Sequence, residues 1–169
     1  MELHGRYVTL RPATPEDIPA IADILAEPEV ARWWGAPDPE ASAREFVEGE
    51  PDVDPFVIEE DGRIIGIIMS WEETDPEYRH AAIDVSLTTD MHGRGRGSDA
   101  VRALAGHLID DRGHHRLTID PEVVNARAIS AYTKVGFRPV GVLRRYQRQP
   151  DGSWVDGLLM DLLADELVR

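Results

Sequence analysis

Glycine and arginine alternate in the segment MHGRGRGSDA, residues 91–100, directly before a stretch with helical periodicity. Glycines allow backbone N–H groups to turn toward a ligand, and the amino end of a helix adds unpaired amides and a positive dipole. Arg94 and Arg96 add cationic charge, so these residue types could bind a phosphate group. A simple glycine-rich turn is the alternative, because Ser98 interrupts the dinucleotide pattern G-x-G-x-x-G and no Gly-Lys-Ser/Thr of a P-loop follows.

Two aspartates occupy positions where sheets with parallel strands bind ligands. Asp84 lies out of register with the apolar Ile83 and Val85, so its side chain leaves their face of the strand. Asp120 ends the strand that follows the next helix, and the carboxyl ends of adjacent parallel strands meet at one edge of a sheet. We expect the two carboxylates to line a ligand site, although an Asp before Pro121 can also serve only as a turn or cap.

Hydrophobic periodicity and turn residues predict the elements that must position these side chains. The strand, helix and strand between Ile83 and Ile119 have the length of a right-handed parallel crossover, and the hairpins add antiparallel strands. We therefore expect one α+β domain over residues 1–169, with a mixed, mostly antiparallel sheet, one parallel crossover and helices on both faces. The expected strands cover 7–14, 80–90 and 115–121; the hairpins cover 54–73, about Asp61–Gly62, and 137–163, about Asp151–Gly152; the helices cover 14–25, with Thr14 as cap, 39–49, 97–113 and 125–136.

The composition restricts the classes of partner. The chain has 169 residues, of which 32 are acidic and 18 basic, and its formal net charge of −14 repels nucleic acid and anionic membranes, although a high net charge can also serve solubility alone. No apolar run approaches the ~20 residues that span a bilayer, and the amino-terminal segment lacks a signal-peptide pattern. We expect a cytoplasmic protein, a monomer or homodimer, that binds neither nucleic acid nor membrane and needs no metal. The absence of cysteine excludes a cysteine nucleophile.

Two motifs resemble signatures of the GNAT acetyltransferase superfamily. The segment HGRGRGSDAVRAL resembles its acetyl-coenzyme A signature, Gln/Arg-x-x-Gly-x-Gly/Ala opening a helix; Gly95 and Gly97 match, and His92 stands where the family has Gln or Arg. The segment NARAISAYTKVGF resembles its Asn-x-x-Ala-x-x-x-Tyr-x-x-x-Gly-Phe run. Together with the element order, the resemblance covers nearly the whole chain and implies a GNAT-like fold with acetyl-CoA as co-substrate. It implies that the cofactor lies against Val85, Leu87, Thr88, His92, Gly93, Arg94, Gly95, Arg96, Gly97, Ser98, Asn125, Ala128 and Tyr132.

This resemblance implies transfer of an acetyl group to an amine. Because no cysteine exists to form an acyl-enzyme, we expect direct attack of the amine on the thioester in a ternary complex. Backbone N–H groups near Val85–Thr88, where the family has a strand bulge, would polarise the thioester carbonyl. Tyr132 would be the acid that protonates the departing thiolate, a role that is compatible with packing of its ring in the core.

Within the superfamily, the chain most resembles aminoglycoside 6'-N-acetyltransferases. The matching segments are RWWG at 32–35, WEETDPEYR at 71–79, AID at 82–84, TIDP at 118–121 and AYTKVGF at 131–137. The resemblance implies that the acceptor is the 6'-amine of an aminoglycoside such as kanamycin, with antibiotic resistance as the result. Aminoglycosides carry several ammonium groups, which carboxylates bind. We expect Asp84 to bind an ammonium and relay its proton, and Asp120 to position it. The expected substrate-binding residues are Trp33, Trp34, Glu72, Glu73, Asp84 and Asp120.

Three other functions stay open at this level. The chain could acetylate protein N-termini or ribosomal proteins, it could acetylate polyamines or other small amines, or it could bind acyl-CoA without catalysis. A peptide N-terminus needs an open groove, whereas a tryptophan pair and acidic residues favour a small cationic molecule. Tryptophan pairs commonly pack in a core or lid and acidic loops are commonly solvated, so only the joint pattern favours the aminoglycoside.

Overall fold

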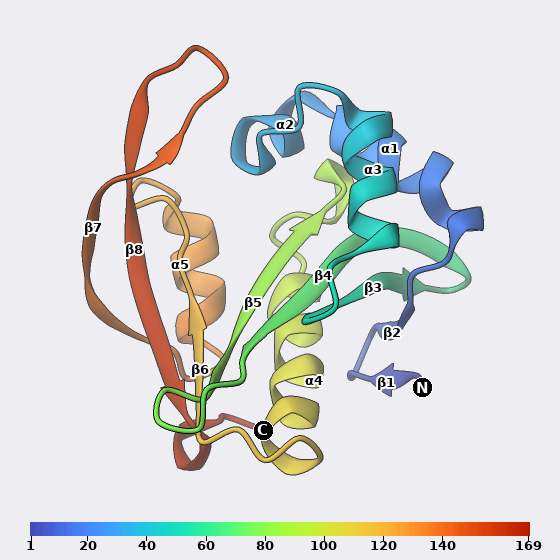
Figure 1. Ribbon diagram of the computed structural model, residues 1–169. Coiled ribbons are helices and arrows are strands. Elements are labelled where there is room, and N and C mark those ends of the chain that lie inside the picture. The colour runs from blue at the N-terminus through green and yellow to red at the C-terminus, as the bar shows by residue number, and fades with distance from the viewer.

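A single mixed sheet runs through the computed structural model, which describes residues 1–169 (Figure 1). Its eight strands follow the order β1-β2-β3-β4-β5-β6-β8-β7, and only β5 and β6 pair in parallel. The expected α+β class, with a mostly antiparallel sheet and one parallel crossover, is confirmed. The strands are β1 Leu3–His4, β2 Thr9–Pro12, β3 Val53–Glu60, β4 Arg63–Glu73, β5 His80–Leu87, β6 Arg116–Ile119, β7 Arg138–Arg148 and β8 Trp154–Leu163.

Helices cover both faces of this sheet, as expected. Helices α1, α2 and α3 pack on one face, and α4 and α5 pack on the other (Figure 1). Because side chains alternate along a strand, neighbouring residues of β4 enter different apolar clusters: Ile67 packs with α1 and α3, and Ile68 packs with α4. The helices are α1 Ile18–Ala26, α2 Pro28–Trp34, α3 Pro39–Glu48, α4 Arg96–Asp110 and α5 Ala126–Thr133, and short 3₁₀ turns cover Pro15–Asp17, Thr89–Met91 and Ala164–Glu166.

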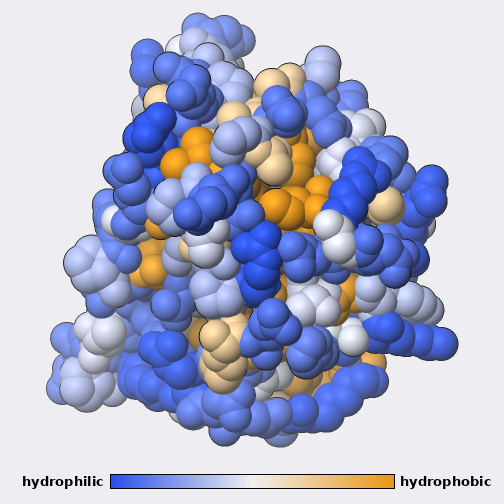
Figure 2. All heavy atoms as spheres, turned by 90° about the vertical axis from the view of Figure 1, so that its right-hand side faces the viewer, coloured by the Kyte–Doolittle hydropathy of each residue, from blue (hydrophilic) through white to orange (hydrophobic).

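One face of the molecule is mostly polar. On the face beyond the β1–β3 edge of the sheet, hydrophilic residues cover most of the surface, and hydrophobic residues show in recesses between them (Figure 2). This surface agrees with the net charge of −14, which keeps many ionised side chains in contact with water. No helix combines the length and the apolar composition needed to cross a bilayer.

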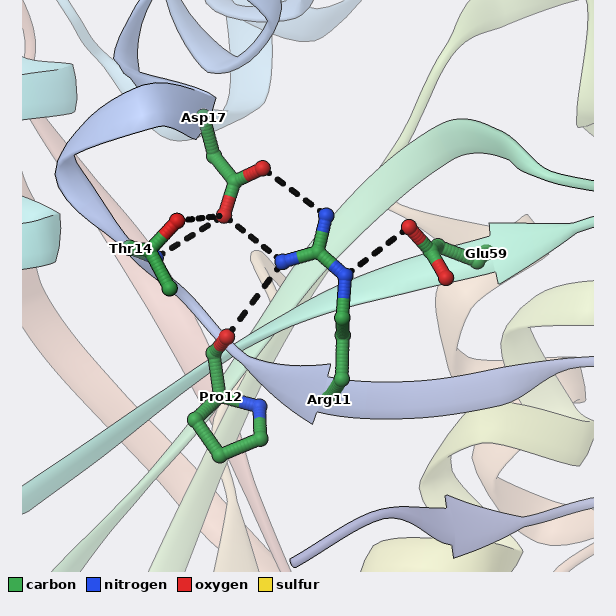
Figure 3. Close-up of polar contacts among 5 residues, drawn as sticks. All are labelled: Arg11, Pro12, Thr14, Asp17 and Glu59. Atoms are coloured by element: carbon green, nitrogen blue, oxygen red, sulfur yellow. Dashed lines mark hydrogen bonds and ion pairs between the residues drawn. The ribbon is translucent and has the colours of Figure 1, made fainter.

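A cluster of ionised side chains fixes the chain where β2 leads into α1 (Figure 3). Arg11 donates to both carboxylate oxygens of Asp17, at 2.7 and 2.8 Å, and through Nε to Glu59 at 2.9 Å. Asp17 also accepts from the N–H and the hydroxyl of Thr14, at 2.8 and 3.0 Å, so Thr14 caps this corner as a donor. The Arg11 guanidinium lowers the pKa of Asp17. These bonds hold the first turn as 3₁₀, and α1 therefore begins at Ile18 rather than at residue 14.

Helix α2 is the main element that periodicity does not predict. Val30 is its only buried residue, so α2 lacks the apolar stripe by which an amphipathic helix is found in a sequence. Its ends follow the usual rules nonetheless. Pro28 stands in the first turn, and Gly35 ends the helix in the left-handed region with φ of 73°. In the sequence, the only indication of this helix is a proline followed seven residues later by a glycine, at positions that suit its first turn and its carboxyl end.

Strands β5 and β6 separate soon after they meet. They pair only at Ala81–Leu117 and Ala82–Thr118, whereas β5 continues to Leu87 toward the end of the sheet where α2 lies (Figure 1). On its other side, β5 keeps one unbroken register with β4 along its whole length. The expected bulge near Val85–Thr88 is therefore wrong. Backbone groups on that edge of β5 are freed because β6 diverges, and no extra residue is inserted.

Candidate active site

Two cavities adjoin in the wedge between β5 and β6. The first, which we name the loop cavity, has a volume of about 240 Å³ and is lined by the 91–98 loop, β5 and α5. The second, the carboxylate cavity, has a volume of about 410 Å³ and is lined by Asp84, Asp120 and residues of α2 and β7. Groups bound in the two cavities can meet, because five residues line both: Trp33, Val85, Ser86, Asn125 and Tyr132.

The amino end of α4 lines the loop cavity. The first backbone hydrogen bond of this helix runs from Asp99 N to Gly95 O, which leaves the N–H groups of Arg96, Gly97 and Ser98 without an acceptor inside the helix. Gly95 precedes the helix with φ of 78°, a conformation that glycine adopts without strain. Three free amides and the positive end of the helix dipole together form an anion site.

Most residues expected at the cofactor line this cavity, with three exceptions. Thr88 lines neither cavity and turns its hydroxyl to Glu27, and Arg94 is exposed outside the loop cavity. Arg96, the third exception, bonds Glu60 through Nε at 2.9 Å, so its charge is neutralised away from the cavity. His92 does line the cavity, and its Nε2 donates to a backbone carbonyl at 2.9 Å, since a carbonyl can only accept. The expected residues that line the loop cavity are Val85, Leu87, His92, Gly93, Gly95, Gly97, Ser98, Asn125, Ala128 and Tyr132.

Helix α5 adds cations to the loop cavity that the sequence analysis missed. Arg127 and Lys134 line this cavity, are exposed, and make no ion pair in the structure. Both lie within the motif from Asn125 to Phe137. The sequence does not show that their side chains face the loop cavity, because this depends on how α5 packs beside β5. They supply the positive charge that the neutralised Arg96 does not.

Asp84 and Asp120 line the carboxylate cavity together, as expected from the strand register. Asp84 lies opposite Met69 of β4, and Asp120 directly follows β6. Partial desolvation among the residues that line the cavity, and then the charge of Asp120, raise the pKa of Asp84 to about 7, although the residue stays exposed to water. Burial also raises the pKa of Asp120, but Tyr146 opposes this shift by donating its hydroxyl hydrogen to Asp120 at 2.8 Å. The two carboxyl groups therefore differ. Asp120 is held by a hydrogen bond from Tyr146, and Asp84 can gain or lose a proton near neutral pH.

Tyr132 stands where the two cavities meet. Its ring packs edge-to-face against Phe137, with centroids 6.4 Å apart, and the residue is buried. Burial, followed by the charges of Asp84 and Asp120, raises the pKa of Tyr132 far above its usual value. The phenol therefore keeps its hydrogen at neutral pH and can act as a proton donor toward a group in either cavity.

The chain matches the acetyltransferase (GNAT) domain family over residues 8–138. It belongs to this family. The GNAT chain is 30% identical over 167 residues to the aminoglycoside N(6')-acetyltransferase type 1 of Klebsiella pneumoniae, in an alignment that covers 88% of this chain and 80% of that protein. The family match over residues 8–138 includes both motifs identified from the sequence.

Solved structures agree with this assignment. Mycobacterium smegmatis RimJ in complex with CoA-disulfide has a TM-score of 0.82 at 26% identity, and the alignment covers 100% of this chain and 88% of that one. The aminoglycoside acetyltransferase AAC(6')-Ib in complex with coenzyme A and kanamycin has a TM-score of 0.77 at 28% identity, covering 94% and 96%. The GNAT protein uses acetyl-CoA as its co-substrate.

Replacing Gly95 by valine is expected to weaken acetyl-CoA binding by the GNAT protein about tenfold. A β-branched residue in the left-handed region costs about 1–2 kcal/mol, and 1.4 kcal/mol corresponds to a factor of about ten. Space around this position is open, so the loss comes from backbone strain that turns the amides away, not from a clash. Arg94→Ala should have a smaller effect, because Arg94 lies outside the cavity. Calorimetric titration of both variants with acetyl-CoA tests the assignment, and equal affinity in Gly95→Val and the wild type would contradict it.

The tryptophans of α2 form one wall of the site. Trp33 lines both cavities, and the Arg32 guanidinium lies over its ring at 4.5 Å. Trp34 lines the carboxylate cavity and packs edge-to-face against Phe46 of α3, with centroids 6.4 Å apart. Both tryptophans therefore pack against the protein and also line the site, so a packing role and a substrate-binding role are compatible.

Two acidic residues expected at the substrate, Glu72 and Glu73, do not line the carboxylate cavity. Asp84 pairs with Met69, so Glu72 falls on the opposite face of the sheet from Asp84. There it forms an ion pair with Arg112 and accepts a hydrogen bond of 2.9 Å from His114, whose pKa is lowered by burial. Glu73 shares the face of Asp84 but stands at the far end of β4, where it accepts a hydrogen bond from a loop amide. Neither is placed to bind a substrate in this cavity.

Strands far along the chain supply the rest of the carboxylate cavity. Tyr146 and Gln147 come from β7, and Met69 and Glu122 complete the wall. The sequence analysis missed all four, because no motif marks them. The place of Tyr146 and Gln147 depends on how the β7–β8 hairpin curves over the wedge, and the place of Met69 depends on its register opposite Asp84.

Proposed function

We propose that this GNAT protein transfers the acetyl group of acetyl-CoA to the 6'-amine of an aminoglycoside by direct attack in a ternary complex, and so confers antibiotic resistance. The observation that carries the proposal is the pair Asp84 and Asp120 in one cavity, next to the cavity that holds free helix amides. A polycationic acceptor needs carboxylates at the point of transfer. Relatives named for aminoglycoside acetylation support the same acceptor.

In this proposal the loop cavity holds the cofactor. The amides of Gly97 and Ser98 bind its pyrophosphate, with Arg127 and Lys134 adding charge. The thioester lies along the freed edge of β5 beyond Ala82, where backbone N–H groups no longer have a strand partner and can polarise its carbonyl.

The proton path follows from the acidities of the two cavity groups. The substrate enters as an ammonium bound by Asp84 and Asp120. Asp84 takes a proton from it, the neutral nitrogen attacks the thioester carbon, and the C–S bond breaks. The thiolate then takes the hydrogen of the Tyr132 hydroxyl, and the second proton of the acetylated nitrogen restores that hydroxyl, which leaves the neutral amide and coenzyme A as products. Asp84 is suited to the first step because its pKa of about 7 allows it to be ionised before the step and protonated after it.

The tryptophan wall and Tyr146 orient the acceptor. Trp33 and Trp34 cover one sugar ring, which presents an apolar face to an indole. Tyr146 holds the Asp120 carboxylate in place through its hydrogen bond of 2.8 Å. This arrangement positions one ammonium near Tyr132.

A thiol-release assay with acetyl-CoA and two aminoglycosides tests the proposed acceptor. Kanamycin, with a 6'-amine, is expected to be acetylated, and paromomycin, with a 6'-hydroxyl, is expected to give little product. Equal rates with both would show that the site of transfer is another amine. Turnover of spermidine or a peptide N-terminus with no turnover of kanamycin would leave the GNAT assignment and reject the aminoglycoside.

Asp120→Asn is expected to lower kcat/KM for kanamycin about tenfold. A hydrogen bond between an ammonium and a carboxylate contributes about 1.5–3 kcal/mol, and 1.4 kcal/mol corresponds to a factor of about ten. The affinity for acetyl-CoA should hardly change, because Asp120 does not line the loop cavity. Asp23→Asn, an equal change of charge at an exposed position of α1, is the control. A parallel loss of acetyl-CoA affinity in Asp120→Asn would indicate a structural role instead.

A further inference from the structure

The corner between α1 and α2 is bonded to the segment that leads into the 91–98 loop. The Glu27 carboxylate accepts from the hydroxyl of Thr88 at 2.5 Å and from the N–H and hydroxyl of Thr89 at 2.7 and 2.5 Å. The backbone carbonyl of Glu27 accepts from the N–H groups of Val30 and Ala31, at 2.9 and 2.8 Å. Glu27 therefore caps the amino end of α2 through its carbonyl and binds residues 88–89, which follow β5, through its carboxylate.

None of these three side chains lines a cavity, but the segments they join do. Neither Glu27 nor the two threonines contact the loop cavity or the carboxylate cavity. Helix α2 places Trp33 between the cavities, and the segment after Thr89 places His92 in the loop cavity. The bonds of Glu27 thus connect a wall of the acceptor site to the loop that binds the cofactor.

Few other contacts hold these two segments in register. The apolar contacts of α2 lie toward α1 and α3, through the buried Val30 and through Trp34 against Phe46, and not toward residues 88–98. The segment after β5 has a second anchor, because Arg63 donates to both carboxylate oxygens of Asp90 at 2.8 and 3.2 Å, but this pair is exposed and does not reach α2. Although burial opposes it, the bonds from Thr88 and Thr89 lower the pKa of Glu27, which therefore stays ionised at neutral pH.

We propose that Glu27 is a positioning residue that couples the two substrate sites. Acetyl-CoA orders the 91–98 loop, Thr88 and Thr89 carry this order to Glu27, and Glu27 fixes α2 with Trp33 at the wall of the carboxylate cavity. Binding of the cofactor therefore prepares the acceptor site, and binding of the acceptor strengthens cofactor binding by the same factor. The inference rests on the proposed function only where kanamycin serves as a probe.

Hydrogen–deuterium exchange tests the coupling without any acceptor. In the wild type, saturating coenzyme A is expected to slow exchange in residues 28–34 as well as in residues 88–98. In Glu27→Ala it should slow exchange only in residues 88–98, whereas the exposed control Asp23→Asn should behave as the wild type. Equal protection of residues 28–34 in Glu27→Ala and the wild type, or none in the wild type, would overturn the proposal. Thr88→Val, which removes one donor and keeps the shape, should weaken the protection and serves if Glu27→Ala does not fold.

Calorimetry with two ligands gives the second readout. Coenzyme A is expected to tighten kanamycin binding about fivefold or more in the wild type, the lower end of the usual range of coupling between two sites. In Glu27→Ala the effect should fall below that range, to less than about twofold. A residue that only stabilised the fold would change the melting temperature and leave this ratio intact. An unchanged ratio in Glu27→Ala would overturn the proposal. Absence of kanamycin binding to the wild type would reject the aminoglycoside, and the exchange experiment would still decide the coupling.

Discussion

Replacing Asp84 by asparagine is expected to lower kcat/KM for kanamycin by about 10²-fold or more, because a positioned general base contributes about 10²–10⁴-fold. The amide can neither pair with the substrate ammonium nor take its proton, so Asp84→Asn should lose more activity than Asp120→Asn. Affinity for acetyl-CoA should be retained, because Asp84 does not line the loop cavity. Steady-state kinetics beside a calorimetric acetyl-CoA titration separate the two effects.

The pH dependence gives Asp84 a signature of its own. Its pKa of about 7 means that the carboxyl is protonated below neutrality and ionised above it. Because the ionised form must accept the proton, kcat/KM should rise with pH and bend near pH 7, and Asp84→Asn should lose this bend. A variant that keeps both the bend and wild-type turnover would remove Asp84 from the proton path.

Whereas kcat/KM should rise with pH, the free energy of unfolding should fall as the pH rises. The folded state raises the pKa of Asp84, so it binds that proton more tightly than the unfolded chain does, and the stabilisation is lost as the pH rises through about 7. Asp84→Asn cannot ionise, and it should therefore raise the melting temperature more at pH 8 than at pH 5. An inactive variant that is more stable at pH 8 would identify the carboxylate as functional and not as part of the scaffold.

Tyr132→Phe is expected to lower kcat by about 10²–10⁴-fold, the usual contribution of a general acid, with acetyl-CoA binding nearly unchanged. The change removes one oxygen and keeps the ring that packs against Phe137. Because burial raises the pKa of Tyr132, the rate of the wild type should show no loss of this acid at mildly alkaline pH. Single-turnover measurements are required, since slow product release can hide a change in the chemical step.

Tyr78→Phe is the matched control for this variant. Tyr78 is 70% exposed and lines neither cavity, so removal of its hydroxyl should leave kcat unaltered. Wild-type single-turnover rates in Tyr132→Phe would limit this tyrosine to a packing role. A fall in acetyl-CoA affinity equal to the fall in rate would place its hydroxyl in cofactor binding instead of proton transfer.

Local rules made much of the fold predictable. Alternating apolar residues identified the central strands, and the length between Ile83 and Ile119 identified the parallel crossover. The same alternation placed Asp84 on the cavity side of β5. The glycine loop at the start of α4 and the Asn125 cap of α5 were also predictable, because backbone conformation and capping depend on a few neighbouring residues.

Partners between distant charges were decided only by the tertiary structure. Glu60, on a strand 36 residues earlier, neutralises Arg96, and Arg112, in the turn after α4, forms an ion pair with Glu72. A sequence shows that these charges exist, but their pairing depends on which face of which strand each side chain occupies. A parity error along one strand is enough to move a carboxylate such as Glu72 from the site to the opposite face of the sheet.

By itself, the sequence determined the family, the order of the elements apart from β1 and α2, and the residues of two local motifs, since each of these is encoded within a short stretch of chain. The tertiary structure alone decided the shape of the site. The divergence of β6 opened the wedge, the curved β7 brought Tyr146 to Asp120, and Glu27 joined α2 to the loop. These features arise from packing between segments far apart in the chain, which no periodicity or motif records.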